Sequence, residues 1–268
     1  MSPDRQHRQK IAHQGICPNC GEQFQRLSMH WRGACGPPTV TRGQRELVTG
    51  LFLGNGYVGG NGANKHFHLS TQWRPFAVWV FREFGWLAAT ITFLDGSRDN
   101  RNRTTPAQQY KVRTHAHPAL TRFRSWYDES GERRLPAPEN LPTGRLTPRA
   151  GRAWHATAGS LGWSNPTYAS TRQAYFSAEA DDRAGRVIAL FESAGFEPTR
   201  AGQGVQLPPK QTAAWLDWIG PPVEGVEYKW AASPEAYRET KRDAEALRAR
   251  LWFQPEVEPS PDIEESTR

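Results

Sequence analysis

The feature that most constrains the fold is an internal repeat, which divides most of the 268-residue chain into two halves. A helix rich in small and apolar residues is predicted over Thr41 to Leu53, and a second is predicted over Thr147 to Thr157. Each begins at a threonine whose hydroxyl can cap free backbone N–H groups. Gln44 completes a capping box in the first helix, and Pro148 suits the first position of the second. The two helices mark equivalent points of a duplicated unit.

The same order of elements follows each helix. Strands are predicted first, and helices accompany them in both halves. In the first half the strands are His66 to Thr71 and Gln109 to Thr114, and the helices are Pro75 to Phe84 and Pro118 to Tyr127. In the second half the strands are Tyr168 to Ala178 and Gly204 to Leu207, and the helices are Ala180 to Gly195 and Lys210 to Ile219. The sequence therefore predicts a pseudo-symmetric α+β fold with halves at about 41–128 and 146–230.

A compact cluster of cysteine and histidine residues precedes the repeat. Cys17 and Cys20 are followed by His30 and then Cys35, and these are all three cysteines of the chain. Three thiolates and one imidazole form a closed tetrahedral set typical of structural zinc. We expect a zinc finger over residues 17–36. Its partner stays open, because contacts with either DNA or protein would suit its exposed side chains.

Charge favours a nucleic-acid partner. Lys and Arg number 34 against 27 Asp and Glu, and the acidic segment 254–268 has a net charge of −4, which leaves +11 on the rest. Arginine suits contacts with phosphate and guanine. No apolar run approaches the ~20 residues of a membrane span, so we expect no membrane partner and a cytoplasmic, nucleoid-associated protein. We expect a flexible basic arm over 1–16, a charged helix over 234–253 and a disordered tail over 254–268.

Several segments in a fixed order carry a resemblance to a known family. The two helices read VTGLFLGNG, ending at Gly56, and GRAWHATAG, ending at Gly159. Between them lie YKVRTHAHPAL, WY, RRLP and LTP, and EYKW ends at Trp230. This series resembles the single-chain LAGLIDADG homing endonucleases over about residues 41–230. The resemblance implies two αββαββα halves whose signature helices meet at the centre, and two sheets that form a saddle over the DNA major groove.

The resemblance also implies that strand-borne polar side chains read a long duplex DNA site. Such side chains reach base edges, while others contact phosphates. The candidates in the first half are Lys65, His66, His68, Arg101, Arg103, Gln109, Lys111 and Arg113. Those in the second half are Arg172, Gln173, Tyr175, Arg200, Gln203 and Gln206.

The chain departs from the family at the catalytic acids. In the family, the residue before the last glycine of each signature helix is an acid that holds the divalent metal. Here these positions are Asn55 and Ala158. The basic positions of the family stay basic, at Lys229 and at Arg134 or its neighbour Arg133. A neutral amide is a poor Mg²⁺ ligand and alanine is none, so Mg²⁺ would bind only if nuclease activity survives.

We therefore expect a monomer that binds a specific duplex DNA site without cutting it, with a role in regulating transcription and an origin in a phage or another mobile element. Three alternatives stay open. The first is an active or nicking homing endonuclease, and the second is an RNA-binding splicing cofactor. The third is a protein-interaction module, which would have no affinity for nucleic acid at physiological salt.

Overall fold

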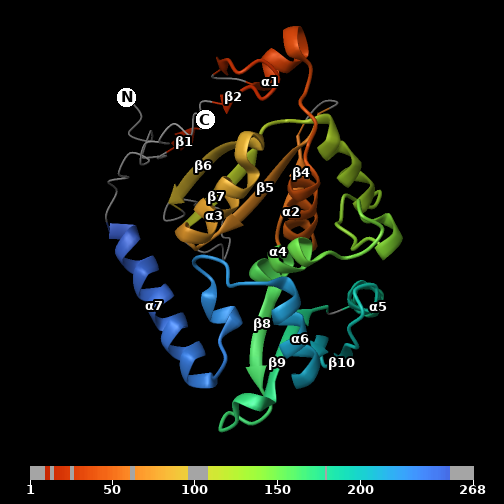
Figure 1. The fold of residues 1–268 in the computed structure, drawn as a ribbon, viewed down its shortest axis with the longest axis vertical. Coiled ribbons are helices and arrows are strands. Elements are labelled where there is room, and N and C mark those ends of the chain that lie inside the picture. Colours follow the sequence, from red (N-terminus) through yellow and green to blue (C-terminus); the bar gives the residue numbers. More distant parts are fainter. Residues whose placement is uncertain are drawn as a thin grey trace, which may run out of the picture.

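The computed structural model describes residues 10–12, 15–24, 27–60, 64–95, 108–178 and 180–253. Along the long axis of the molecule, a small N-terminal finger lies at one end and two larger α+β halves follow it (Figure 1). Helix α2 (Arg42–Leu53) of the first half and helix α4 (Pro148–Ala158) of the second half meet near the centre. Helix α7 (Pro234–Phe253) runs along one side of both halves.

The first half begins with α2, and its strands form an antiparallel sheet. Its sheet has the order β1-β6-β7-β5-β4, and helix α3 packs against β5, β6 and β7. The remaining elements are β4 (Tyr57–Gly59), β5 (His66–Thr71), α3 (Arg74–Phe84), the 3₁₀ turn η2 (Gly85–Leu87), β6 (Ala88–Asp95), β7 (Gln108–Thr114) and the 3₁₀ helix η4 (Pro118–Trp126).

The second half repeats this order. Its sheet has the order β10-β11-β9-β8, which matches β6-β7-β5-β4 strand for strand. Its elements after α4 are β8 (Gly159–Trp163), η6 (Ala169–Thr171), β9 (Arg172–Ser177), α5 (Asp181–Glu192), β10 (Thr199–Ala201), β11 (Gly204–Leu207) and α6 (Pro209–Ile219), and η7 (Glu227–Trp230) follows. Both halves therefore read helix, two strands, helix, two strands, helix, and the α+β class is confirmed.

Part of the segment expected to be a flexible arm is ordered. Strand β1 (Lys10–Ala12) pairs with β6 and adds a fifth strand to the first sheet. Strand β2 (Gly15–Ile16) pairs with β3 (Gln23–Phe24) in the finger. Backbone pairing satisfies donors and acceptors that a free arm would leave to water, so the expectation was wrong for these residues. Residues 1–9 and the acidic segment 254–268 lie outside the described residues.

The close contact between α2 and α4 depends on small residues. A Cβ atom on Gly50 would lie 2.0 Å from the carbonyl oxygen of Ala150, and one on Gly54 would lie 1.9 Å from Oγ1 of Thr157. Both helices begin as the sequence predicts. Thr41 and Gln44 form a capping box, and the Thr147 hydroxyl accepts a hydrogen bond from the Ala150 backbone N–H. The caps thus fix the residue at which each helix begins, and the small residues let the two helices lie in close contact.

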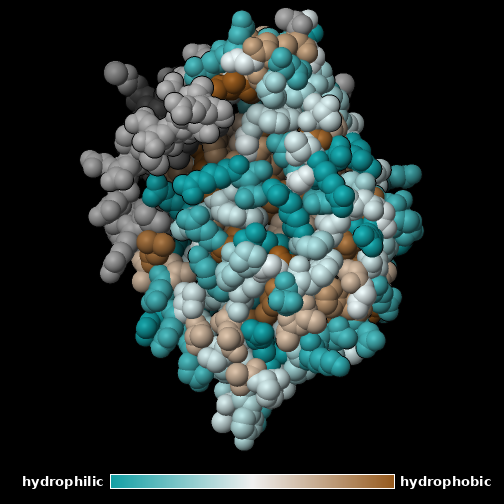
Figure 2. All heavy atoms as spheres, viewed as in Figure 1, coloured by the Kyte–Doolittle hydropathy of each residue, from teal (hydrophilic) through white to brown (hydrophobic). Residues whose placement is uncertain are grey.

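Aromatic side chains fill the core of each half. In the second half Trp154, Phe176, Phe191 and Trp215 are fully buried and contact one another. His155 is also fully buried, with Nε2 2.9 Å from the Lys229 carbonyl oxygen. On the face shown in Figure 2, hydrophilic side chains predominate and apolar ones are scattered. Apolar side chains are thus buried inside each half, between the sheet and its helices, where the hydrophobic effect stabilises the fold.

The finger and α7 are both attached to the domain by aromatic contacts. Trp31 of the finger is buried and lies edge-on to Trp86 and His117, at centroid distances of 5.4 and 5.8 Å. On α7, Tyr237 contacts Trp163 of the second half, and Arg248 lies over Trp73 of the first. Helix α7 thus bridges the two halves. Among the helices within the described ranges, none is both long and apolar enough to span a bilayer.

Candidate nucleic-acid interface and metal centre

The finger brings the four predicted metal ligands together. One ligand atom from each of Cys17, Cys20, His30 and Cys35 can be chosen so that all four lie within 4.8 Å of one another. Helix α1 (Leu27–His30) carries the histidine, and the π-helix η1 (Trp31–Cys35) carries the last cysteine. Sγ of Cys20 lies 3.4 Å from Nε2 of His30. The four residues are placed to bind one metal ion.

The electrostatics of this cluster also suit a cation. Burial opposes ionisation of Cys17, but hydrogen bonds from the backbone of Asn19 and Cys20 lower the pKa of its thiol to about 6. For Cys35, burial and the other two thiols raise the pKa to about 11. Several thiolates so close together repel one another unless a metal ion shares their charge. A soft set of three sulfur atoms and one imidazole nitrogen fits zinc geometry.

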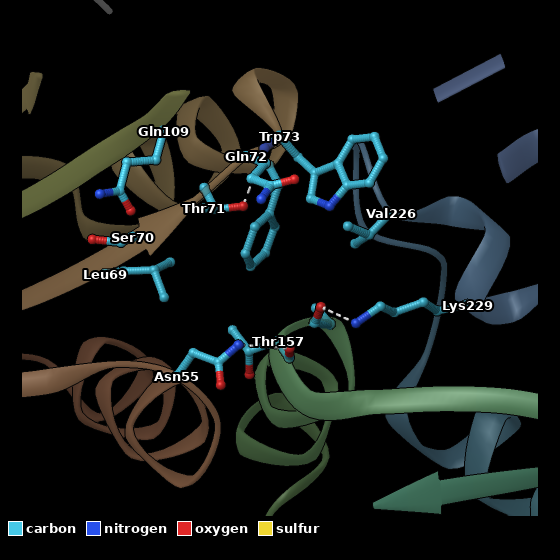
Figure 3. Close-up of a pocket in the computed structure, with 12 residues that line it drawn as sticks. Asn55, Leu69, Ser70, Thr71, Gln72, Trp73, Gln109, Thr157, Val226 and Lys229 are labelled. Atoms are coloured by element: carbon cyan, nitrogen blue, oxygen red, sulfur yellow. Dashed lines mark hydrogen bonds between the residues drawn. The ribbon is translucent and has the colours of Figure 1, made fainter. Parts of the chain in front are cut away.

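A polar cavity of about 260 Å³ lies between the two halves, beside the C-terminal ends of α2 and α4. Figure 3 shows Asn55 and Thr157 at those helix ends, with Ser70, Gln72 and Gln109 across the cavity and Lys229 at one side. Its lining residues are Asn55, Leu69, Ser70, Thr71, Gln72, Trp73, Phe76, Gln109, Ala156, Thr157, Val226 and Lys229. Hydroxyls, amides and one ammonium group therefore face this space.

The two residues that the sequence resemblance aligns with the catalytic acids offer no anionic ligand. Asn55 follows α2, and its Nδ2 donates to the Thr157 carbonyl oxygen at 3.2 Å, which ties the two helix ends together. Ala158 is the last residue of α4 and carries only a methyl group. No carboxylate is among the residues that line the cavity. Mg²⁺ prefers carboxylate oxygens, so this donor set does not fit it.

Lys229 is the basic group of the cavity. It is 9% exposed, and its Nζ donates to the Ala156 carbonyl oxygen at 2.8 Å. Burial lowers the pKa of this lysine to about 8. Perturbed lysines of this kind are common at functional sites. The cavity thus holds a partly desolvated positive charge.

The first-half counterpart of Lys229 is Arg133 rather than Arg134. Nη1 of Arg133 donates to the carbonyl oxygens of Phe52 and Gly56 at 2.9 and 2.7 Å, at the end of α2. Arg134 instead is exposed and pairs with Asp128 at 3.1 Å. Of the two candidates for this basic position, the structure therefore favours Arg133 over Arg134.

The outer side of the first sheet, opposite the helices, carries a connected polar group that we call the first open face. Tyr57 stacks on His68 with ring centroids 4.6 Å apart, and Nζ of Lys111 lies 5.6 Å from the Tyr57 centroid. An Nη2 of Arg113 lies 3.3 Å from Nδ1 of His66. The register adds neighbours on the same side, so the face comprises Tyr57, His66, His68, Ser70, Thr90, Thr92, Gln109, Lys111 and Arg113.

Positive charge surrounds the two histidines of this face. Burial, together with Arg113, Lys111 and Lys65, lowers the pKa of His66 to about 4. Burial, together with His66, Lys111 and Arg113, lowers the pKa of His68 to about 3. Both imidazoles are therefore neutral at pH 7 and can accept as well as donate hydrogen bonds. Lys65 lies just before β5, where its Nζ donates to the Gly60 carbonyl oxygen at 2.8 Å.

The outer side of the second sheet, which we call the second open face, is built from neutral groups. The Tyr175 hydroxyl donates to Oε1 of Gln173 at 2.7 Å. Tyr175 also lies beside Gln206 in the register of β9 and β11. The members of this face are Ser160, Gln173, Tyr175, Ser177, Thr199 and Gln206. Gln203 lies in the exposed turn between β10 and β11.

Two arginines that we predicted from the sequence to contact DNA lie on the other side of the sheet. Arg172 shares its side with the buried Ala174, and its Nη1 donates to the Ala231 carbonyl oxygen at 2.7 Å. Arg200 pairs with Val205 across the strands and with the carboxylate of Asp181 at 3.0 Å. We therefore remove both from the candidate interface.

Other residues were missed or cannot be placed. Tyr57, Gln72 and Thr157 were not singled out, although Gln72 continues the alternation of His66, His68 and Ser70. That alternation was the available signal, because every second strand residue faces the same side. Arg101 and Arg103 lie outside the described residues.

Comparisons with known proteins give a likeness among solved structures. No protein-family model matches the sequence, and none of the curated proteins matches it. Among solved structures, the chain is similar to one described as "The homing endonuclease I-WcaI bound to its DNA recognition sequence", with a TM-score of 0.57 and 16% identity. The match covers 81% of this chain and 95% of that one. The chain therefore has a homing-endonuclease-like α+β fold.

Proposed function

We propose that this protein binds a specific duplex DNA site as a monomer and has lost the nuclease activity of LAGLIDADG enzymes. The observation that carries the proposal is the central cavity. Its lining combines Lys229 with amides and hydroxyls and includes no carboxylate. A basic cavity without acids suits a DNA phosphate, whereas metal-dependent strand cleavage needs acidic ligands.

Two further observations support DNA as the partner. The structural neighbour was solved with its DNA recognition sequence. In this chain, the two open faces present cations, imidazoles and amides, the groups that reach base edges in the major groove. Both halves lie in one chain, so a single copy supplies both faces. The role we propose is that of a transcriptional regulator that occupies its site without cutting it.

Restoring the acids tests the loss of cleavage. The double variant Asn55→Asp with Ala158→Asp returns a carboxylate to each helix end. We expect Mg²⁺-dependent cutting of a bound duplex by this variant and no cutting by the wild-type protein. The matched control is Asn55→Ala with Ala158→Ser, which changes both positions without adding charge. Strand breaks made by the wild-type protein would favour the active or nicking endonuclease instead.

Competition between nucleic acids tests the proposed partner. The protein is bound to a labelled DNA duplex, and unlabelled hairpin RNA or unlabelled duplex DNA of equal length is added as competitor. We expect duplex DNA to displace the label at lower concentration than RNA. The reverse order would favour an RNA-binding splicing cofactor, and no binding to either at physiological salt would favour a protein-interaction module.

For the finger, we propose zinc as the bound ion in a purely structural role. The donor set carries this part of the proposal, because three cysteines and one histidine leave no open coordination position for a reactant. The four residues that would hold the ion are Cys17, Cys20, His30 and Cys35. The ion would supply much of the folding free energy of this short segment.

A further inference from the structure

The two open faces differ in charge. The first contains Lys111 and Arg113, at the centre of β7. Across the described strands of the second sheet, no residue on the outer side carries a formal charge. The two sheets otherwise match strand for strand, so the difference lies in side chains and not in architecture.

The second sheet lacks outer charge because its two strand arginines lie on the side of the sheet that faces the helices. Arg172 is half-buried and donates to the Ala231 backbone, next to η7. Arg200 is held by Asp181 in the first turn of α5. Both guanidinium groups are therefore used within the protein. In this register neither side chain lies on the outer side of the sheet, because a β-strand residue cannot change sides without a shift of register.

The chemistry of the two faces predicts different tasks. Lysine and arginine on DNA release counterions and give affinity that falls steeply with salt. They also pair with guanine, whereas glutamine pairs with adenine through two hydrogen bonds. Neutral groups such as Gln173, Tyr175 and Gln206 can discriminate between bases through hydrogen bonds, but they add little electrostatic attraction to the DNA phosphates. Lys111 lies over the Tyr57 ring, and Arg113 lies beside His66, so the first-face cations are also held in place.

We propose that the two halves divide recognition unequally: the first open face anchors the DNA through cations, and Gln173, Tyr175 and Gln206 of the second read an adenine-containing half-site through neutral hydrogen bonds. This inference rests on the proposed function, since it assigns tasks within the same DNA interface. It names the second-half specificity residues and excludes Arg172 and Arg200 from them.

Salt dependence of DNA binding tests the division. The dissociation constant of each variant is measured against salt concentration on the duplex that the wild-type protein selects. The plot of log affinity against log salt concentration has a negative slope, and Lys111→Gln with Arg113→Gln should make it less steep by about 1 to 2 units. Gln173→Ala with Gln206→Ala should leave the slope unchanged and relax base preference in one half of the site only.

A matched charge control separates the two sides of the second sheet. Arg200→Gln removes one positive charge from the helix side and should not change the slope. Gln173→Arg adds one charge to the outer side and should make the slope steeper by about 1 unit. This gain-of-charge variant keeps the test decisive if the first-face double variant fails to fold, which thermal melting would show.

Two outcomes would overturn the inference. If the wild-type protein binds duplex DNA and Arg200→Gln makes the slope less steep by as much as the first-face variant does, the division of tasks is wrong and the proposed function stands. If the wild-type protein binds no duplex DNA, the proposed function and this inference both fail.

Discussion

At the scale of single residues, the buried ammonium group of Lys229 is the most informative feature. Its one hydrogen bond in the cavity goes to the Ala156 carbonyl oxygen, and no carboxylate lines the same space. A buried charge without an opposite charge destabilises a fold unless a ligand provides one. The residue therefore costs stability in the free protein, and a bound phosphate would offset that cost.

The variant Lys229→Met should raise the free energy of unfolding and weaken DNA binding. A pKa that falls from 10.5 in the unfolded chain to about 8 in the fold means that the fold disfavours the proton. At pH 7 this burial costs the wild-type fold about 3 kcal/mol. The variant recovers only part of that cost, because it also loses the hydrogen bond to the Ala156 carbonyl oxygen. Chemical denaturation and DNA binding of both proteins measure the two effects.

The pH dependence of the same pair checks the cause. Between pH 8 and 10.5 the unfolded wild-type chain binds a proton at Lys229 that the folded chain has released. Wild-type stability should therefore gain on that of the variant as pH rises through this window, and the gap should be constant below it. A gap that does not change with pH would show that packing, and not charge, separates the two proteins.

The sequence alone did not decide which of two adjacent arginines reaches the end of α2, or which side of a strand an arginine occupies. Arg133 and Arg134 both suit the basic position of the family, but only the structure shows that Arg133 reaches the end of α2. Arg172 and Arg200 were grouped with the outer residues because no large apolar neighbour fixes the phase of the alternation: Arg172 lies between Thr171 and Gln173, and Arg200 between Thr199 and Ala201. A one-residue change in phase reverses the side of every residue in the strand.

At the scale of elements, the contact between α2 and α4 determines how the halves meet. Small residues on both helices let the backbones approach, and Asn55 adds a hydrogen bond to Thr157 where the helices end. The sequence predicted these helices well, because caps and small-residue spacing are local signals. It missed β4, β6, β8 and β10, whose pairing depends on residues distant in the chain.

A pair of glycine substitutions tests the close contact. Gly50→Ala should destabilise the protein by about 2 to 4 kcal/mol, because its Cβ would lie 2.0 Å from backbone of the facing helix. Gly185→Ala, in the exposed part of α5 with no atom within 4 Å of the added Cβ, should stabilise it by about 0.5 to 1 kcal/mol. Thermal melting compares them. Equal effects of the same sign would contradict a close-packed α2–α4 interface.

The finger offers a second test at this scale. The purified protein should contain one zinc ion per chain, measured by elemental analysis. Chelation should unfold the finger, remove Trp31 from its contacts with Trp86 and His117, and change tryptophan emission, while the two halves stay folded. Cys20→Ser should reproduce the change without a chelator, and Ser28→Ala, on the short helix α1 that carries His30, should not. Retention of full zinc content by the Cys20 variant would show that this thiol is not a ligand.

At the scale of the whole molecule, the chain has a homing-endonuclease-like fold whose central cavity is basic and is lined by no carboxylate. The α+β duplication was predictable because repeated caps and helices leave a visible period. The charge difference between the sheets was not, since it depends on which side of each strand faces out. The finger lies at one end of the molecule, and α7 lies along one side, where it links both halves through Tyr237 and Arg248.

The most direct test is a selection from a random duplex library, with the zinc-loaded protein and Mg²⁺ present, in which bound and cut molecules are both sequenced. We predict a long enriched motif that is recovered uncut and that contains adenine in the half-site read by Gln173, Tyr175 and Gln206. Cut ends at a fixed place within the motif, or no enrichment at all, would contradict the account of a site-specific DNA-binding protein without nuclease activity.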